Sequence, residues 1–151
     1  MAVIRSATPA DAARIAALEE RLFSDAWSEK MIADCLSKAY YRVMVCVDES
    51  DVILGYLIST HLAGESELLR IGVEPEYRGL GNGKLLMRAF VQECEKGDCP
   101  EAFLEVRASN VSAIHLYKKF GFTAVGARKN YYHDPEEDAC LMAGTMRMPG
   151  W

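Results

Sequence analysis

Val73-Glu-Pro-Glu-Tyr-Arg-Gly-Leu-Gly-Asn-Gly-Lys-Leu-Leu86 is the segment that decides the fold, because a strand pattern ends there and a helix pattern begins. The apolar run before it stops at Glu74-Pro75, since proline cannot continue a central strand. Three glycines then occupy every second position: Gly79, Gly81 and Gly83. Glycine lets backbone N–H groups approach a ligand closely, and a helix start adds roughly half a positive charge. The segment therefore predicts a site for a phosphate-bearing ligand.

The spacing of these glycines excludes two common nucleotide-binding loops. A P-loop needs Ser or Thr after Gly-Lys, but Gly83-Lys84 is followed by Leu85. The dinucleotide fingerprint would need a third glycine at position 84, which is lysine. The run from Arg78 to Gly83 has the spacing Arg-x-x-Gly-x-Gly. It resembles the pyrophosphate-binding signature of the GCN5-related N-acetyltransferases (GNAT), which use acetyl-coenzyme A. A glycine-rich surface turn that caps a helix is the alternative that this short pattern leaves open.

Length and composition favour one globular domain spanning residues 1–151, with 50% apolar and 26% charged residues. No apolar run approaches 18 residues and no signal pattern begins the chain, so we expect a cytoplasmic protein that does not bind a membrane. The net charge of −5 disfavours nucleic acid as a partner. An acidic surface would instead attract a basic peptide or an amine.

The cysteines and histidines predict neither disulfides nor a metal site. Five cysteines, an odd number, include no C-x-x-C pair, which indicates reduced thiols and argues against structural zinc. The three histidines are scattered without metal-ligand spacing. We therefore expect no metal cofactor.

The first half of the chain reads as a strand, two helices and an antiparallel meander. A short strand at 3–5 precedes a helix capped by Thr8, and a second helix begins at Ser28. Met31, Ile32, Cys35 and Leu36 are expected to face inward from this second helix. Three turn-linked strands follow, at 42–47, 52–61 and 67–73.

The second half predicts a crossover to a parallel strand. A helix from Lys84 to Gly97 leads to a strand at 102–106, and such strand–helix–strand units make parallel neighbours. A helix at 111–120 and a final strand pair, 122–128 and 139–148, complete the chain, with Tyr131 and Tyr132 in the joining loop. The expected fold is α/β (α+β): a mixed, strongly twisted sheet of six or seven strands, antiparallel first and parallel at the glycine loop, with about four helices.

A second motif strengthens the resemblance. Leu104-Glu-Val-Arg-Ala-Ser-Asn110, followed by Ala113-Ile-His-Leu-Tyr117 and Phe120-Gly-Phe122, closely resembles one GNAT group. These are the bacterial N-α-acetyltransferases that modify the N-terminal alanine of a small-subunit ribosomal protein (the RimI group). The likeness also includes Trp27-Ser-Glu-Lys30 and Asn130-Tyr-Tyr132, so it covers nearly the whole chain. It implies the GNAT fold and acetyl transfer from acetyl-coenzyme A by direct attack in a ternary complex.

The resemblance implies catalytic roles for Glu105 and Tyr117. Glu105 would be the base that removes the amine proton, directly or through water, and Tyr117 the acid that protonates the coenzyme A thiolate. Without the resemblance, Glu105 reads as a strand-end carboxylate paired with Arg107 or Lys118. Tyr117 reads equally as a core residue on a helical face. A tyrosine can do both, since its ring can be buried while its hydroxyl reaches a polar site.

Further residues are implied to bind acetyl-coenzyme A. Asn110 most simply caps the following helix, and in the family the matching residue also contacts the coenzyme. Backbone groups of Ile71, Gly72 and Val73 would meet the pantetheine arm and the thioester, and Gly72 is expected to loosen the strand or permit a bulge. Arg70 stands where many relatives have asparagine. The pyrophosphate would lie against the glycine loop, formed by Arg78, Gly79, Leu80, Gly81, Asn82, Gly83 and Lys84.

For the acceptor peptide the resemblance points to Trp27, Tyr131 and Tyr132. An acidic run at 134–138 is either a solvated turn or an attraction for basic residues that follow the acceptor alanine. The partners expected are acetyl-coenzyme A and the basic N-terminal peptide of a ribosomal protein. Two alternatives stay open: an acetyltransferase for a lysine side chain or small amine, and a non-catalytic module that binds acyl-coenzyme A.

Overall fold

The computed structural model describes residues 1–147, which form a seven-stranded mixed sheet with four α-helices. The strands are β1 (Val3–Ser6), β2 (Tyr41–Val47), β3 (Ile53–Leu62), β4 (Glu65–Val73), β5 (Glu101–Arg107), β6 (Thr123–Tyr132) and β7 (Glu137–Thr145). The α-helices are α1 (Ala12–Leu22), α2 (Glu29–Leu36), α3 (Asn82–Lys96) and α4 (Val111–Lys119). Short 3-10 turns at Pro9–Asp11 and Pro75–Tyr77 precede α1 and the glycine loop.

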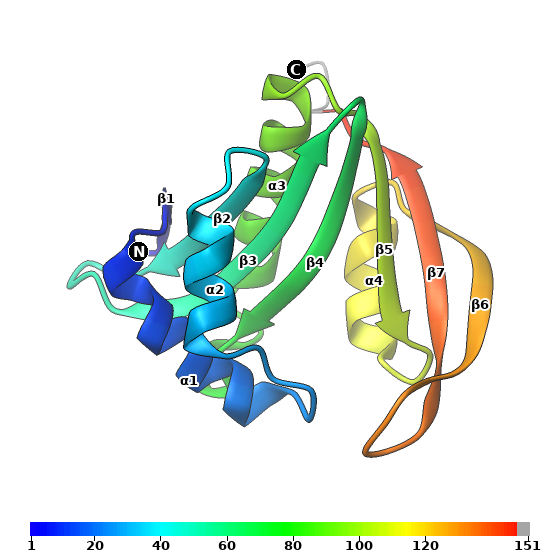
Figure 1. Cartoon of the computed structure of the whole chain (residues 1–151), viewed down its shortest axis with the longest axis horizontal. Helices are drawn as coiled ribbons and strands as arrows, with labels where there is room; N and C mark the ends of the chain where they lie inside the picture. The colour runs from blue at the N-terminus through cyan, green and yellow to red at the C-terminus, as the bar shows by residue number, and fades with distance from the viewer. Residues whose placement is uncertain (148–151) are drawn as a thin grey trace.

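The sheet confirms the predicted mixed topology. Its strand order is β1-β2-β3-β4-β5-β7-β6, and every neighbouring pair is antiparallel except β4 and β5. The crossover from β4 through α3 to β5 makes that one parallel pair, as the strand–helix–strand pattern predicted. The parallel pairing covers only residues 65–68 and 101–104. Beyond it the two strands diverge, which opens the V-shaped gap at the centre of Figure 1.

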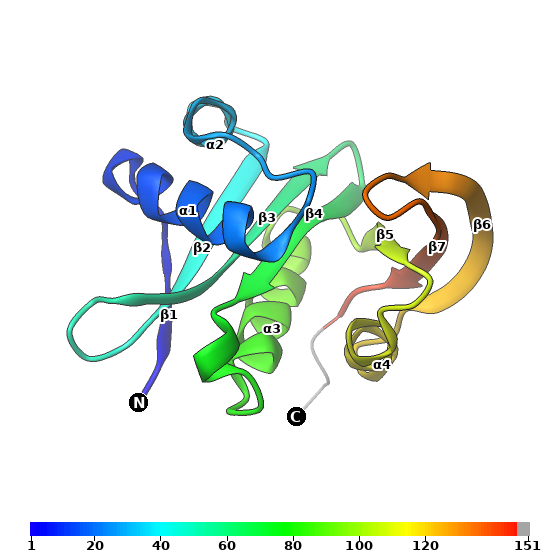
Figure 2. The same cartoon turned by 90° about the horizontal axis from the view of Figure 1, so that it is seen from below.

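Two helices cover each face of the sheet. Helices α1 and α2 lie on one face over β2, β3 and β4, whereas α3 and α4 lie on the other (Figures 1 and 2). Two hydrophobic clusters result, one on each face. The first contains Ile15, Leu18 and Tyr56, and the second contains Phe90 and Phe122. Within residues 1–147, no helix has both the length and the apolar character needed to cross a membrane.

A β-bulge in β4 sets the direction of its side chains near the gap. Ser59 pairs with Leu68 and Ile58 pairs with Arg70, so Leu69 is the extra residue. Leu69 packs with the cluster under α1 and α2, and Arg70 also faces that side, where it contacts Phe23. The bulge therefore points two consecutive residues, Leu69 and Arg70, at the same face.

Gly72 pairs with Tyr56 and does not form this bulge, so the bulge that was offered as one reading of Gly72 was wrong. A Cβ at position 72 would lie 2.7 Å from Leu22 Cδ1 and 2.8 Å from the Tyr56 hydroxyl oxygen. Glycine is needed at this position because α1 and the Tyr56 side chain approach the β4 backbone this closely.

Three local predictions also need correction. Met31 is 45% exposed, because the buried face of α2 is narrower than the apolar pattern suggested and centres on Ile32 and Cys35. Strand β6 continues to Tyr132, so Tyr131 and Tyr132 end a strand instead of lying in a loop. The meander's last strand begins at Glu65, two residues before the predicted start. The predicted end of the last strand, Met148, lies outside the described residues.

Candidate functional site

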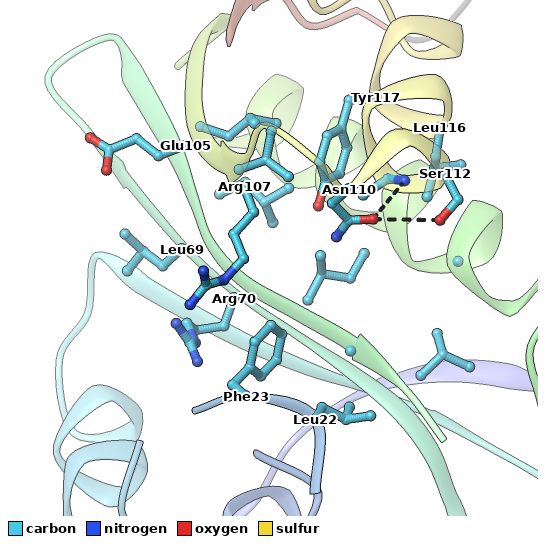
Figure 3. A pocket seen from close by; sticks show the side chains of 18 of the residues that line it. Leu22, Phe23, Leu69, Arg70, Glu105, Arg107, Asn110, Ser112, Leu116 and Tyr117 are labelled. Atoms are coloured by element: carbon cyan, nitrogen blue, oxygen red, sulfur yellow. Dashed lines mark hydrogen bonds between the residues drawn. The ribbon is translucent and has the colours of Figure 1, made fainter. Parts of the chain in front are cut away.

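A pocket of about 740 Å³ opens where β4 and β5 separate. The glycine loop lines one end, α4 lines one side, and the α1–α2 and β6–β7 loops line the other end. Figure 3 shows side chains from the α1–α2 region, β4, β5 and α4 lining the pocket. Eleven of the site residues predicted from the sequence line it: Ile71, Gly72, Val73, Arg78, Gly79, Asn82, Gly83, Glu105, Asn110, Tyr117 and Tyr132.

The glycine loop has the backbone geometry of an anion cradle. Gly79 and Gly81 have φ values of 77° and 86°, a region that glycine enters without the strain other residues suffer. No atom lies within 4 Å of a Cβ built at either position, so the loop backbone is open to a ligand. Gly81 is the N-cap of α3, which directs the positive end of that helix at the same space.

The Asn82 side chain holds this loop in shape. It is buried, and its Nδ2 donates to the Tyr77 carbonyl at 3.0 Å. The Cys46 thiol lies 3.7 Å from its Oδ1. Any ligand contact from Asn82 therefore falls to its backbone. Leu80, Gly81 and Lys84 do not line the pocket, although they belong to the predicted motif.

Glu105 lies on β5 one residue beyond the last parallel pair and is 26% exposed. Its carboxylate forms an ion pair with Arg128, whose Nε lies 3.3 Å from Glu105 Oε1. The alternative partners expected from the sequence, Arg107 and Lys118, are thus wrong, because β6 brings Arg128 across the sheet. A hydrogen bond with Glu105 is the main cause that raises the pKa of Tyr131.

A second carboxyl group lies close to Glu105. Burial, followed by the charge of Glu105, raises the pKa of Glu67 on β4. Burial and the neighbouring charge of Glu105 both disfavour the ionised form of Glu67.

Tyr117 reaches the pocket from the opposite side of β5. Asn110 caps α4 by accepting from the Ala113 N–H at 3.3 Å, which confirms the predicted cap. The Tyr117 side chain is buried, and burial raises its pKa, with Tyr132 adding to the shift. In Figure 3, Glu105 points away from Tyr117, so the two predicted catalytic groups flank the strand.

Arg107 joins the two loops at the far end of the pocket. Its guanidinium donates to the His133 carbonyl at 2.8 Å and the Pro135 carbonyl at 2.7 Å, both in the β6–β7 loop. It also donates to Ser24 Oγ, in the α1–α2 loop, at 3.3 Å. Its Cζ lies 4.6 Å from the centre of the Tyr132 ring. Arg107 therefore holds Tyr132 and both loops together.

Neither Trp27 nor Tyr131 lines the pocket, unlike Tyr132. Trp27 is half-buried and packs against the cluster under α1 and α2. Tyr131 is 47% exposed and lies beside Glu105 and Arg128 on the outer side of the site. Of the three predicted acceptor residues, Tyr132 alone therefore lines the pocket.

The acidic run at 134–138 is partly structural. Glu137 accepts from the Ser109 N–H at 2.6 Å and pairs with Arg107 at 3.4 Å. Asp138 accepts from the Asn130 N–H at 2.9 Å. These two carboxylates fix the β6–β7 hairpin, while Asp134 lines the pocket. Within residues 1–147 no group of three or more His, Cys, Asp or Glu side chains could hold a metal ion.

Several pocket residues were not predicted. They include Phe23, Ser24 and Asp25 from the α1–α2 loop, Leu116 and Ser112 from α4, and Arg107 from β5. Arg107 had one available signal, because it follows Glu105 by two residues and so shares its face of β5. The loop residues had none, because only the folded chain brings them to β5.

Comparison with known proteins gives a consistent result. Residues 12–122 match the sequence model of the acetyltransferase (GNAT) family. The chain is 34% identical over 128 residues to the ribosomal protein bS18-alanine N-acetyltransferase of Escherichia coli, covering 83% of this chain and 85% of that protein. It is 32% identical over 146 residues to the protein of the same name from Haemophilus influenzae, covering 95% and 98%.

The fold matches a solved structure over almost its full length. The crystal structure of the ribosomal-protein-S18-alanine N-acetyltransferase from Escherichia coli superposes with a TM-score of 0.88. The match covers 99% of this chain and 97% of that one at 33% identity. The predicted mixed-sheet fold is therefore confirmed.

Proposed function

Because the chain belongs to the GNAT acetyltransferase family, we propose that it transfers acetyl from acetyl-coenzyme A to the N-terminal amine of a protein. The acceptor is the N-terminal alanine of a small-subunit ribosomal protein in the cytoplasm. The observation that carries this proposal is the likeness to the ribosomal protein alanine N-acetyltransferases, which extends through both ends of the pocket.

The residues at the donor end fit the pyrophosphate of acetyl-coenzyme A. The open backbone at Gly79 and Gly81 and the N-terminus of α3 provide N–H groups for an anion. The exposed Arg78 side chain adds a positive charge, and its Nε lies 3.3 Å from the Val73 carbonyl at the end of β4. From this loop, the pantetheine arm would follow β4 past Val73, Gly72 and Ile71 toward the centre of the pocket.

The reaction needs a base for the amine and an acid for the leaving thiolate. Glu105 takes a proton from the acceptor amine, directly or through water, as the amine nitrogen bonds to the carbonyl carbon of the thioester. When the C–S bond breaks, Tyr117 gives its proton to the sulfur. Burial raises the pKa of Tyr117, which keeps its hydroxyl protonated at neutral pH.

Direct transfer is favoured over a covalent enzyme intermediate. Within residues 1–147 none of the five free cysteines lines the pocket, so no thiol is placed to accept the acetyl group. Both substrates would therefore bind together before the chemical step.

The acceptor end suits the start of a basic peptide. Asp25 and Asp134 line it from the two loops that Arg107 connects. An α-amino group has a pKa of about 7.7–8.0, whereas a lysine side chain has about 10.4 and demands more from the base. A carboxylate such as Glu105 is a modest base, which suits the α-amine better.

Intact-mass measurement of ribosomal proteins from cells with and without this enzyme tests the natural acceptor. We expect one small-subunit protein with N-terminal alanine to lose the mass of an acetyl group when the enzyme is absent. An unchanged set of masses would contradict the ribosomal substrate.

A panel of purified acceptors tests the reaction itself. It compares an alanine-ended basic peptide, the same peptide with a blocked N-terminus and a free lysine, and a polyamine. Faster turnover of either alternative acceptor would assign the protein to lysine or small-amine acetylation. Coenzyme A binding without turnover of any acceptor would indicate a non-catalytic module.

A further inference from the structure

Arg70 is buried at the junction between β4 and the α1–α2 loop, residues 23–28. The bulge at Leu69 turns its side chain toward this loop, where only 11% of it is exposed. The guanidinium carbon lies 4.3 Å from the centre of the Phe23 ring and 5.4 Å from that of the Trp27 ring. The guanidinium is thus held between two aromatic side chains of the same loop.

A fully buried carboxylate faces this guanidinium. Glu19, on α1, accepts from Arg70 Nη2 at 2.6 Å and from Nε at 3.1 Å. Asp25, in the loop, receives a second, longer contact at 3.4 Å. The paired geometry with Glu19 uses the planar fork of arginine, which the single ammonium of lysine cannot reproduce.

Glu19 connects the same loop to the sheet. It accepts a hydrogen bond from the Tyr56 hydroxyl on β3 and another, of 3.0 Å, from the Trp27 backbone N–H. Its two oxygens therefore join α1, β3, β4 and the end of the loop. A buried ion pair with satisfied partners has few alternative arrangements, because each charge would be left without compensation elsewhere.

We infer that Arg70 is a positioning residue that fixes the α1–α2 loop and so sets the shape of the acceptor end of the pocket. Phe23 and Asp25 line that end, and Arg70 lines it as well. Figure 3 shows Arg70 beside Phe23, while Tyr117 comes from α4 on another side of the pocket. This role rests on the proposed function, in which the acceptor peptide binds between these loops. Arg70 then controls acceptor binding without touching the reacting atoms.

Two variants separate positioning from simple loss of folding. Arg70→Lys keeps the charge and loses the fork, while the double variant Glu19→Gln with Arg70→Gln removes both buried charges together. Arg42→Gln is the matched control, since Arg42 also forms an ion pair, with Glu93 at 3.0 Å, but lies outside the pocket. Each is assayed with acetyl-coenzyme A and an alanine-ended basic peptide.

The inferred role predicts a KM for the peptide at least tenfold higher in both Arg70 variants. It also predicts kcat within about threefold and unchanged affinity for acetyl-coenzyme A, because the donor end and Glu105 are untouched. Amide hydrogen exchange should accelerate at residues 23–28 and stay as in the wild type at the glycine loop. The control should resemble the wild type in all four readouts.

Wild-type peptide KM together with wild-type exchange at residues 23–28 in both Arg70 variants would overturn the role. A kcat loss without a change in KM would also overturn it, since that pattern belongs to a group acting in the chemical step. Hydrogen exchange needs no acceptor. If the wild type acetylates no peptide, that result refutes the proposed function. Exchange then still decides the anchoring of the loop: unchanged exchange in the variants refutes it, and faster exchange upholds it.

Discussion

Leu68 and Leu104 are the last paired residues of β4 and β5, and each strand continues beyond them without the other. The next residue on β4 is the bulge residue Leu69, and the next on β5 is Glu105. The gap therefore begins where both backbones lose their shared hydrogen bonds. A ligand that extends into it can bond to the free backbone groups of β4, with Glu105 beside it on one face and Tyr117 on the other.

Removing either proposed catalytic group should lower kcat and leave donor binding intact. We expect Glu105→Gln and Tyr117→Phe each to reduce kcat roughly 100-fold, the usual contribution of one acid or base. Acetyl-coenzyme A affinity, measured by calorimetry, should change little. The control is Glu101→Gln, since Glu101 shares the β5 face but lies outside the pocket. Near wild-type turnover in both variants would contradict the assigned roles.

Loss of the Arg107 contacts should weaken acceptor binding. Hydrogen bonds from a charged donor contribute about 1.5–3 kcal/mol, so Arg107→Ala should raise the peptide KM about tenfold or more. Arg107→Lys should be intermediate, because one ammonium cannot reach the His133 and Pro135 carbonyls and Ser24 together. Steady-state kinetics with varied peptide tests this, and an equal KM in all three proteins would refute the clamp.

Adding one methyl group at Gly72 should destabilise the fold. The new Cβ would overlap Leu22 and the Tyr56 hydroxyl, and overpacking of this kind costs about 1–3 kcal/mol. Gly126→Ala is the control, because the nearest atom to its Cβ would be Leu141 Cδ1 at an ordinary 3.5 Å. Urea unfolding measures both, and equal midpoints would show that the contact at Gly72 relaxes without cost.

A buried histidine should make stability depend on pH between about 4 and 6.5. Burial, with a smaller contribution from the charge of Arg42, lowers the pKa of His61 from 6.5 to about 4. Its ring nitrogens bond to Ser59 at 2.8 Å and to Ser66 at 2.7 Å. The unfolded chain binds the proton more readily, so stability is complete above pH 6.5 and falls as the pH drops toward 4, by up to about 3 kcal/mol.

The His61→Gln variant tests this dependence. Its free energy of unfolding should vary less between pH 6.5 and 4 than that of the wild type, because glutamine does not titrate. Urea unfolding at several pH values measures the difference. Parallel pH curves for the two proteins would show that His61 does not contribute.

The donor half of the site was predictable because it is local in sequence. The turn at Gly79 and Gly81, the start of α3 and the Asn110 cap each depend on residues within a few positions. Apolar periodicity likewise predicted the strands and the parallel crossover. Met31 and the strand at Tyr131 and Tyr132 were missed, because exposure and strand ends depend on neighbours that are distant in the chain.

Short-range spacing alone determined the mixed sheet, the open glycine loop and the placement of Glu105 at the end of its strand. The tertiary structure decided the partners of the charged groups. Glu105 pairs with Arg128, Arg70 pairs with Glu19, and Arg107 donates hydrogen bonds to the two loops. Arg70 and Glu19 are 51 residues apart, and sequence patterns carry no information on which buried charges will meet. The acceptor end of the pocket is made of such long-range pairs, because desolvated charges are stable only where the fold supplies an opposite charge.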